Sequence, residues 1–568
     1  MEQLHLATLV ASIDSQLASE QLERVSHKSE RGFTVLLVSA LTLFALAIDG
    51  YHPYAEDGGL YMAGVKRLLD PALYPHGTAF VLEPARLSLF APTVAALVRL
   101  SHLGLPLVLL ALHLVSVWAT LFAAWMLASR CWRWRSARAG AVLLLACWLV
   151  LPVAGTALTL MDPYLTARSF STPCMVLALV AVLDMTERSR TPYGRRRGLL
   201  LWAASIALAA AMHPLMAAYA LGATLMLICM RSPSRSVRAW GTVTFAVATL
   251  ALAACLQSIA NPESAAYLRI AMTRTYWFPA QWRWYELVGL AAPLAILTLF
   301  ACAGHRDAAG ADAPQPALSS SKGLAPEMWD RAAVDSTLRT PAAALARMAV
   351  AVGATAWMVA LLFARTGAPT HLVARMQPLR TFQIVYLVLL LVLGAKLGQL
   401  VLRRSVWRWA VAAMLLGGVM LASERTAFPD SNHLELPWTT WTTPQNPWVQ
   451  AFLWIRANTP KDALFALDAD YINLPGEDAQ CFRAITERSA LPDYSKDGGE
   501  ASIAPELSPT WTIAQTAQQG LSAPATTDAA RMAALTPLGV SWVVLEATAQ
   551  TRFDCPYSNA AVRVCRLR

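Results

Sequence analysis

The residues best suited to chemistry lie just after the first long apolar segment, where Glu56 and Asp57 stand side by side. Adjacent acids can bind a cation or divide roles, and their mutual repulsion and partial burial can raise the pKa of one toward that of a working general base. The following Gly58 and Gly59 would let the backbone approach a ligand closely. The alternative is an acidic loop in which Asp57 caps a helix expected over residues 60–69.

A second group of polar candidates lies in other loops that we expect on the same side of the membrane. Asp162 is a candidate ligand for a substrate or a metal, but an Asp followed by a proline is equally a typical helix start. Arg168 follows it closely in the sequence. His213 precedes a proline, and is either a site residue or a hydrogen-bonded turn residue. His52, in the first loop, completes this group.

Basic residues in two further outer loops are candidates for binding phosphate. Arg274 lies in one loop, and His371, Arg375 and Arg380 lie in the next. Outer arginines oppose the usual charge bias of membrane proteins, and guanidinium groups bind phosphate through two hydrogen bonds. The alternative is snorkelling to the interface, with ion pairs to nearby acids such as Glu263.

The composition places these residues in a polytopic membrane protein. Of 568 residues, 56% are hydrophobic and 14% are charged, against about 25% charged in a typical soluble domain. The mean hydropathy is +0.44. A soluble enzyme, a secreted disulfide scaffold and a disordered chain are thereby excluded. We expect a mainly α-helical bundle of about 11 spans, at 33–49, 105–128, 139–157, 170–184, 198–211, 213–230, 238–257, 285–303, 345–364, 380–402 and 406–422.

The apolar run 198–230 is too long for one ordinary span. We expect His213-Pro214 to divide it into two helices, because proline lacks the amide donor that a helix interior requires. One long kinked helix is the alternative.

The distribution of arginine predicts the orientation. Four short loops, at 130–138, 188–197, 231–238 and 403–404, are rich in arginine and fall on one side of the predicted bundle. By the positive-inside rule that side is cytoplasmic. The net charge of +10 is therefore a membrane signal, and no nucleic-acid partner is expected.

The tripeptide Trp-Arg-Trp occurs three times, each time at the end of a predicted span, beginning at Trp132, Trp282 and Trp407. Tryptophan and arginine at such positions are typical interfacial anchors. A functional role is the alternative.

The predicted organisation has four parts. Residues 1–32 form a cytoplasmic N-terminal segment, and 33–422 form the bundle, with functional outer loops at 50–104, 158–169, 258–284 and 365–379. The Ala/Pro/Ser/Gly-rich segment 304–344 is a cytoplasmic linker. Residues 423–568 form a small extracytoplasmic α/β domain, because expected helices alternate there with short strands.

Two features of this last domain stand out. Cys555 and Cys565 flank an expected turn, and outside the cytoplasm they can form a disulfide. The stretch Phe482–Asp497 is unusually rich in charge. It is either a solvated loop or a loop that reaches over a membrane cavity to bind a polar ligand.

The combination of these features resembles the GT-C superfamily of integral membrane glycosyltransferases. It consists of an acidic pair in the first outer loop, a further acid in the second, basic residues near the outer surface and a C-terminal outer domain. Stretches like Asp162–Arg168 and Arg375–Arg380 also resemble those of bacterial members without an assigned activity, which implies a multi-pass protein of the bacterial inner membrane.

The resemblance implies transfer of a hexose or pentose from a polyprenyl-phosphate donor to an acceptor at the outer face, within the cell envelope. Glu56 or Asp57 would be the general base, while Arg375 and Arg380, with Arg274, would hold the departing phosphate. Some members of the superfamily use a divalent cation, Mg²⁺ or Mn²⁺, and others do not. If this chain uses one, Asp162 would be its ligand.

Two other functions remain open. A transporter or flippase of a lipid-linked or anionic substrate would need ionisable residues at mid-membrane, where His113 and Lys396 are the main candidates. A non-catalytic envelope assembly protein would leave Glu56 and Asp57 solvated and far from the arginines.

Overall fold

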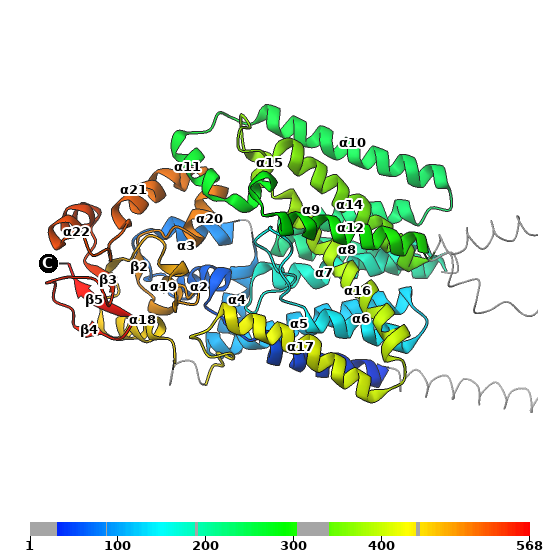
Figure 1. Ribbon diagram of the computed structural model, residues 1–568, viewed down its shortest axis with the longest axis horizontal. Coiled ribbons are helices and arrows are strands. Elements are labelled where there is room, and N and C mark those ends of the chain that lie inside the picture. The colour runs from blue at the N-terminus through cyan, green and yellow to red at the C-terminus, as the bar shows by residue number, and fades with distance from the viewer. Residues whose placement is uncertain (1–30, 87, 188–190, 304–339, 439–443, 568) are drawn as a thin grey trace, which may run out of the picture.

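The computed structural model describes residues 31–86, 88–187, 191–303, 340–438 and 444–567. Most of the predicted N-terminal segment and of the predicted linker 304–344 lies outside this range. The described residues form a long helical bundle with a smaller mixed region at one end, and the C-terminus lies at the far tip of that region (Figure 1). The predicted fold class, a membrane helix bundle with a small C-terminal α/β region, is confirmed.

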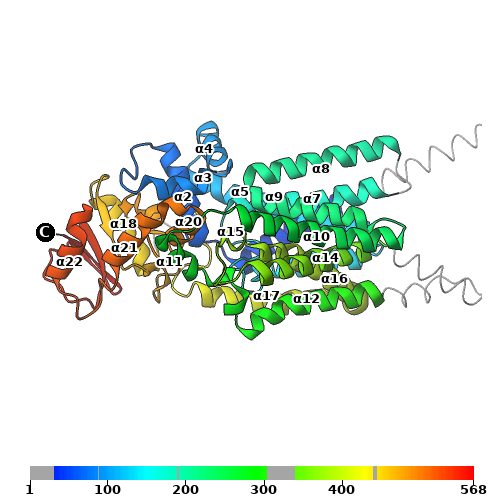
Figure 2. The same ribbon diagram turned by 90° about the horizontal axis from the view of Figure 1, so that it is seen from above.

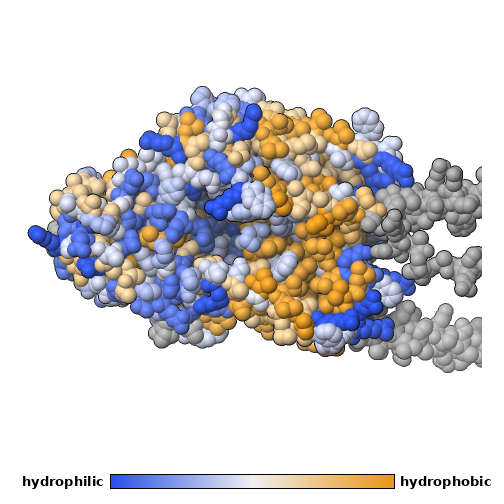
Figure 3. All heavy atoms as spheres, in the orientation of Figure 1, coloured by the Kyte–Doolittle hydropathy of each residue, from blue (hydrophilic) through white to orange (hydrophobic). Residues whose placement is uncertain are grey.

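The bundle contains a helix at each of the eleven predicted spans. Among the described residues, eight helices are long and apolar enough to cross a membrane. Apolar side chains cover much of the bundle on the visible face, and hydrophilic side chains are more frequent over the mixed region (Figure 3). The helices are Arg31–Asp49, α5 (Leu105–Cys131), α6 (Arg135–Cys147), α7 (Ala167–Thr186), α8 (Pro192–Met212), α9 (Pro214–Met230), α10 (Arg235–Ile259), α12 (Trp284–Ala303), α14 (Pro341–Phe363), α16 (Phe382–Lys396) and α17 (Val406–Ala427).

The third predicted span, 139–157, is wrong in its second half. Helix α6 ends at Cys147, and residues 148–166 run irregularly with one short bridge between Pro152 and Thr159. Gly155 packs directly under the ring of Trp282. Hydropathy reports burial, and here the apolar residues are buried by neighbouring helices without forming a helix themselves.

The division at His213 is confirmed. Helix α8 ends at Met212 and α9 begins at Pro214. At the other end of the bundle, Arg231 Nε lies 3.3 Å from Thr186 Oγ1, next to the start of α8. Helices α8 and α9 therefore form an antiparallel hairpin, and its turn at His213 lies at the end nearer the mixed region (Figure 2).

The mixed region combines two distant parts of the chain. The first outer loop supplies α2 (Glu56–Leu69), α3 (Thr78–Arg86) and α4 (Phe90–Ser101), and the C-terminal segment supplies a five-stranded sheet. The sheet order is β2-β1-β3-β5-β4, in which β1 is parallel to β2 and β3, and β5 is antiparallel to β3 and β4. The strands are β1 (Leu464–Ala466), β2 (Ser489–Ala490), β3 (Trp542–Glu546), β4 (Tyr557–Ser558) and β5 (Val562–Arg566).

Helices from the C-terminal segment cover this sheet and meet the first outer loop. They are α18 (Pro447–Asn458), α19 (Phe482–Thr486), α20 (Lys496–Ile503), α21 (Ser508–Gln518) and α22 (Asp528–Leu535). One hydrophobic core contains Met62 and Phe90 from the outer loop together with Phe452, Phe465 and Phe482 from the C-terminal segment. This shared core fixes α2, and the acids at its start, against α19.

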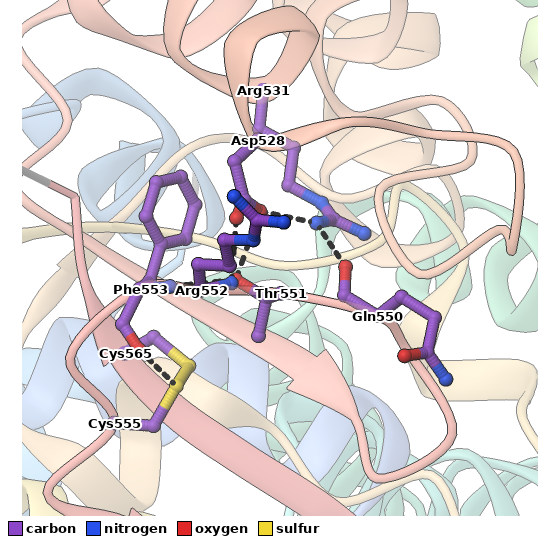
Figure 4. Close-up of a disulfide and its surroundings, with 8 residues drawn as sticks. All are labelled: Asp528, Arg531, Gln550, Thr551, Arg552, Phe553, Cys555 and Cys565. Atoms are coloured by element: carbon purple, nitrogen blue, oxygen red, sulfur yellow. Dashed lines mark hydrogen bonds and ion pairs between the residues drawn. A yellow bond between two sulfur atoms is a disulfide. The ribbon is translucent and has the colours of Figure 1, made fainter.

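A disulfide closes the end of the chain. Cys555 and Cys565, the pair expected from the sequence, are bonded to each other across the β4–β5 hairpin (Figure 4). The adjacent segment is held by Asp528, which accepts hydrogen bonds from the Thr551 hydroxyl and the Arg552 amide.

Candidate active site

Helix α2 carries the acidic pair in its first turn. Ala55 occupies the N-cap position and makes no side-chain cap, so the expected role of Asp57 as a cap is wrong. The Glu56 amide donates to the Ala479 carbonyl at 2.8 Å, which ties the helix start to the C-terminal segment. Acids in a first turn are stabilised by the helix dipole, and both side chains remain available for other partners.

Two cations from different parts of the chain hold the Asp57 carboxylate. Lys496 Nζ, from the start of α20, lies 3.3 Å from Asp57 Oδ1 and also contacts Glu56 Oε2. Arg168, from the first turn of α7, places Nη1 3.2 Å from Asp57 Oδ2 and Nη2 2.9 Å from Asp162 Oδ2. One carboxylate thus joins the bundle to the C-terminal segment.

These cations reverse the pKa shift expected for the acidic pair. Burial by itself raises the pKa of Asp57, but Lys496, Arg168 and Arg380 together lower it well below its usual range. Burial likewise lowers the pKa of Lys496, and the two carboxylates more than compensate, so its pKa is raised. Asp57 is therefore an ionised carboxylate, and not the neutral acid that repulsion within an isolated pair would produce.

Gly58 and Gly59 serve packing within the protein. A Cβ at Gly58 would lie 2.9 Å from Tyr164 Cβ, and a Cβ at Gly59 would overlap Cys481 and the Tyr54 carbonyl oxygen. The expectation that these glycines admit a ligand is wrong. They let α2 approach the second outer loop on one side and α19 on the other.

A cavity of about 890 Å³ opens beside Asp57 between the bundle and the C-terminal segment. Six of the candidate site residues line it: Asp57, Arg168, His213, Arg274, Arg375 and Arg380. They come from α2, α7, the α8–α9 turn, the end of α11 (Ala265–Thr273) and the segment α15 (Leu372–Arg375) to η3 (Pro378–Thr381). Only the folded chain brings these segments together.

The three arginines expected to bind phosphate differ in how far they are already engaged. Arg274 donates to the Ser495 and Tyr494 carbonyls at 2.8 and 2.9 Å, so it holds the loop that carries Lys496. Arg375 donates a long hydrogen bond, 3.3 Å, to the Ile503 carbonyl. Arg380 is half-buried, and its buried Nε has no hydrogen-bond partner among the described residues. Arg380 is the guanidinium best placed to receive an anion.

Four candidates lie outside the cavity wall. Glu56 lies beside it and contacts Lys496. Asp162 lies behind Arg168. His52 is buried elsewhere, stacked on Phe428 at 4.1 Å, with Glu424 and Glu435 at 3.6 and 3.4 Å from its ring nitrogens. His371 is held by Glu263, with Nδ1 to Oε2 at 2.6 Å. The structure thus engages His52 and His371 within the fold.

Asp162 is not a helix cap. Helix α7 begins at Ala167, and Thr166 and Ser169 form its capping box. Asp162 Oδ1 accepts from the Thr159 hydroxyl at 2.7 Å, while Oδ2 accepts from Thr166 and Arg168. Its role in the structure is to orient the guanidinium that meets Asp57.

The donor set does not fit a divalent cation on Asp162. Both of its oxygens accept hydrogen bonds, and both oxygens of Asp57 face protein cations. Within the ranges that the structure describes, no group of three or more His, Cys, Asp or Glu side chains could hold a metal ion. The reaction steps proposed for this chain use its own side chains and no metal ion.

Several cavity residues were not singled out from the sequence: Tyr61, Tyr276, Gln377, Asn473 and Glu500. Tyr494, Ser495 and Lys496 also line the cavity, and they belong to the charged stretch Phe482–Asp497 for which a cavity loop was one of two readings. The high density of charged residues in this stretch was the sequence feature that could have indicated Lys496 as a site residue. Glu500 follows four residues later on the same face of α20, which helical spacing could have indicated.

Comparisons with known proteins were made by sequence and by structure. No protein-family model and no curated protein matches the sequence. Among solved structures, the oligosaccharyltransferase AglB from Archaeoglobus fulgidus, in complex with an inhibitory peptide and a dolichol-phosphate, is 11% identical, with 91% of this chain and 70% of that chain covered and a TM-score of 0.42. The same archaeal enzyme in complex with Zn and sulfate is 11% identical, with 90% of this chain and 68% of that chain covered and a TM-score of 0.40.

A bacterial protein gives a similar result over its whole length. ArnT from Cupriavidus metallidurans is 12% identical, with 95% of this chain and 98% of that chain covered and a TM-score of 0.34. These neighbours belong to the GT-C superfamily, which is the superfamily that the sequence resembles. All these TM-scores are below 0.5, so the likeness carries no argument about function.

Proposed function

We propose that this chain is a GT-C-type membrane glycosyltransferase that moves a sugar from a polyprenyl-phosphate donor to an acceptor at the outer face of the membrane. The observation that carries the proposal is the cavity beside Asp57. Its lining includes the ionised Asp57 carboxylate and Arg380, whose Nε has no partner within the described ranges. A base for the acceptor and a cation for the leaving phosphate are what glycosyl transfer requires.

Asp57 is the acid that meets the acceptor in this proposal, because it lines the cavity and Glu56 does not. Its lowered pKa makes this carboxylate a weak base toward the free acceptor, so it accepts the proton of the acceptor hydroxyl or amine late, once the new bond to the sugar C1 has made that proton strongly acidic. The bond between C1 and the phosphate oxygen breaks, and its electron pair leaves with the lipid phosphate. Arg380 faces the charge that develops on that phosphate, and Arg168 holds Asp57 in place.

The location of the cavity supports transfer at the outer face. It lies at the end of the bundle that contacts the C-terminal segment, whereas the arginine-rich loops lie at the opposite end (Figure 2). By the positive-inside rule the cavity end is extracytoplasmic. The lining mixes charged side chains with Leu60, Leu215 and Ile503, which suits a phosphate attached to a long apolar chain.

The test uses the full chain in lipid nanodiscs with radiolabelled polyprenyl-phosphate sugars and extracted envelope lipids as acceptors. We expect Asp57→Asn to lower kcat/KM by on the order of 100-fold or more, the usual contribution of a general base. Asp70→Asn is the matched control, since Asp70 caps the other end of the same helix and its side chain is 43% exposed. Equal activity in the two variants would contradict the role of Asp57.

A binding measurement separates the donor from the chemistry. We expect polyprenyl phosphate to bind the wild-type chain and Asp57→Asn, and to bind Arg380→Ala at least about 10-fold more weakly, as for loss of a charge-assisted contact. Failure of the wild-type chain to bind any polyprenyl phosphate would overturn the proposed donor.

A further inference from the structure

A second cavity lies at the opposite end of the bundle, far from Asp57. It has a volume of about 720 Å³ and lies between the first span, α6 and the start of α17. Four arginines line it: Arg133 and Arg135 from the α5–α6 connection, and Arg403 and Arg404 from the turn before α17. Hydrophilic side chains gather at this end of the apolar surface (Figure 3).

Close helix packing brings the two arginine pairs together. Gly140 on α6 lies against Gly394 and Gly398, so closely that a Cβ at any of the three would overlap the facing backbone. Gly398 lies in a π-helical turn, Leu397–Leu402. A hydrogen bond from the Arg403 amide to the Gly398 carbonyl, 2.9 Å long, closes this turn. The wider turn delivers Arg403 and Arg404 beside the loop that carries Arg133.

Among the residues that the structure describes, no acidic side chain forms an ion pair with any of these four arginines. Arg403 donates from Nε to the Leu400 carbonyl at 2.9 Å, and all four residues are exposed. Uncompensated guanidinium groups clustered around one cavity attract an anion, and phosphate suits their geometry best.

The rest of the lining is apolar and aromatic. Leu37 and Leu41 from the first span and Leu143 from α6 form one wall, and Phe33, Trp134 and Trp409 lie nearer the arginines. Trp134 and Trp409 belong to two of the three Trp-Arg-Trp tripeptides, which are far apart in sequence and meet only here. Interfacial anchoring alone does not require two such tripeptides to share one cavity.

We propose that this cavity is a binding site for an anionic phospholipid of the cytoplasmic leaflet, with the arginines on the headgroup phosphate and the leucine wall along an acyl chain. Basic cavities between helices on the cytoplasmic side have the chemistry that such headgroups require. The site is separate from the proposed transfer reaction and does not depend on it.

The test is native mass spectrometry of the purified full chain in detergent, with phosphatidylglycerol, phosphatidylcholine and inorganic phosphate as separate probes. We expect phosphatidylglycerol to be retained in preference to phosphatidylcholine. The double variant Arg133→Ala/Arg404→Ala takes one exposed arginine from each side, and we expect its affinity for phosphatidylglycerol to fall about 30-fold, as for two arginine–headgroup contacts. Arg133→Lys/Arg404→Lys retains the charge and should lose less.

The matched control is Arg195→Ala/Arg196→Ala, two exposed arginines at the same end of the bundle that line no part of this cavity. We expect it to bind phosphatidylglycerol as the wild type does. An equal loss in the control would show general surface attraction and overturn the site. Equal retention of both lipids by the wild type would overturn it too, and displacement of the lipid by inorganic phosphate would overturn the assignment to a lipid.

Discussion

At the scale of single residues, position decides what each acid does. Glu56 and Asp57 are adjacent in the sequence, yet only Asp57 lines the cavity and is held by both Lys496 and Arg168. Asp162, the third acid, supports Arg168 from behind. The cations beside Asp57 lower its pKa, whereas an acid without such a partner keeps a pKa raised by burial.

Glu500 is the acid of this second kind. It lines the cavity one turn after Lys496 on α20, but Lys496 is engaged by Glu56 and Asp57, so the usual ion pair between positions four apart does not form. Burial raises the pKa of Glu500 well above its ordinary value, and the nearby Asp57 raises it further.

We therefore predict that binding of polyprenyl phosphate weakens as the pH rises through the raised pKa of Glu500, because the ionised side chain then repels the phosphate. Below that pKa Glu500 is neutral and binding is strongest. Asp57 contributes nothing to this change, since its lowered pKa keeps it ionised throughout. The dissociation constant measured against pH should lose this transition in Glu500→Gln, and a wild-type profile shared by the variant would contradict the prediction.

Lys496 gives a prediction about stability. Lys496→Met leaves Glu56 and Asp57 without their shared cation, and we expect the free energy of unfolding in detergent to fall by about 1–2 kcal/mol, less than for a fully buried pair. The reason for the reduction is solvent screening, as the two carboxylate side chains are 37% and 31% exposed. Lys461→Met is the control, because Lys461 is 66% exposed in its pair with Asp70 and should matter little. Equal effects would contradict the role given to Lys496.

At the scale of elements, helix α2 is the piece that connects the site to the rest of the fold. Its first turn carries the acids, its glycines pack against neighbouring segments, and Lys66 in its last turn donates to the Ala484 carbonyl at 2.7 Å and to Glu487 at 2.8 Å. The helix is held at both ends by the C-terminal segment, so the position of Asp57 depends on contacts made far along the chain.

The packing of α2 predicts opposite effects for two Gly→Ala changes. Gly59→Ala introduces a Cβ that overlaps Cys481 and the Tyr54 carbonyl, and we expect it to destabilise the protein by about 1–3 kcal/mol. Gly418→Ala, on α17, has nothing within 4 Å of the new Cβ and should stabilise its helix by about 0.5–1 kcal/mol. Thermal unfolding of the two variants in the same detergent checks the signs, and a neutral Gly59→Ala would show that α19 can move away.

At the scale of the whole molecule, the site lies where two bodies meet. The bundle supplies Arg168 and Arg380, and the C-terminal segment supplies Lys496 and Glu500, while the shared core of the first outer loop and the C-terminal segment aligns them. The disulfide lies at the far tip of this region, away from the cavity (Figures 1 and 4). Stability at the tip and activity at the site should therefore be separable.

Removing the disulfide tests this separation. We expect Cys555→Ser/Cys565→Ser to lower the stability of the C-terminal segment by about 2–3 kcal/mol, the entropy of a loop of about ten residues. Binding of polyprenyl phosphate should be unchanged at a temperature where the segment remains folded. Reductant should reproduce the loss in the wild type and have no effect on the double variant. A loss of lipid binding in the folded variant would show that the tip and the cavity are coupled.

The sequence by itself determined the membrane class, the approximate positions of the bundle helices, the break at His213 and the small α/β region, because hydropathy and proline act locally along the chain. It also identified Asp57, Arg168, His213 and Arg380, since polar residues in outer loops are few. Only the tertiary structure decided which of these residues meet. It paired His52 and His371 with acids distant in the sequence, placed Asp162 behind Arg168, and brought Lys496 across to Asp57. Except for Asp162 and Arg168, which are 6 residues apart, those contacts join residues 108 to 439 positions apart. They arise from helix packing and a shared core that no local pattern encodes.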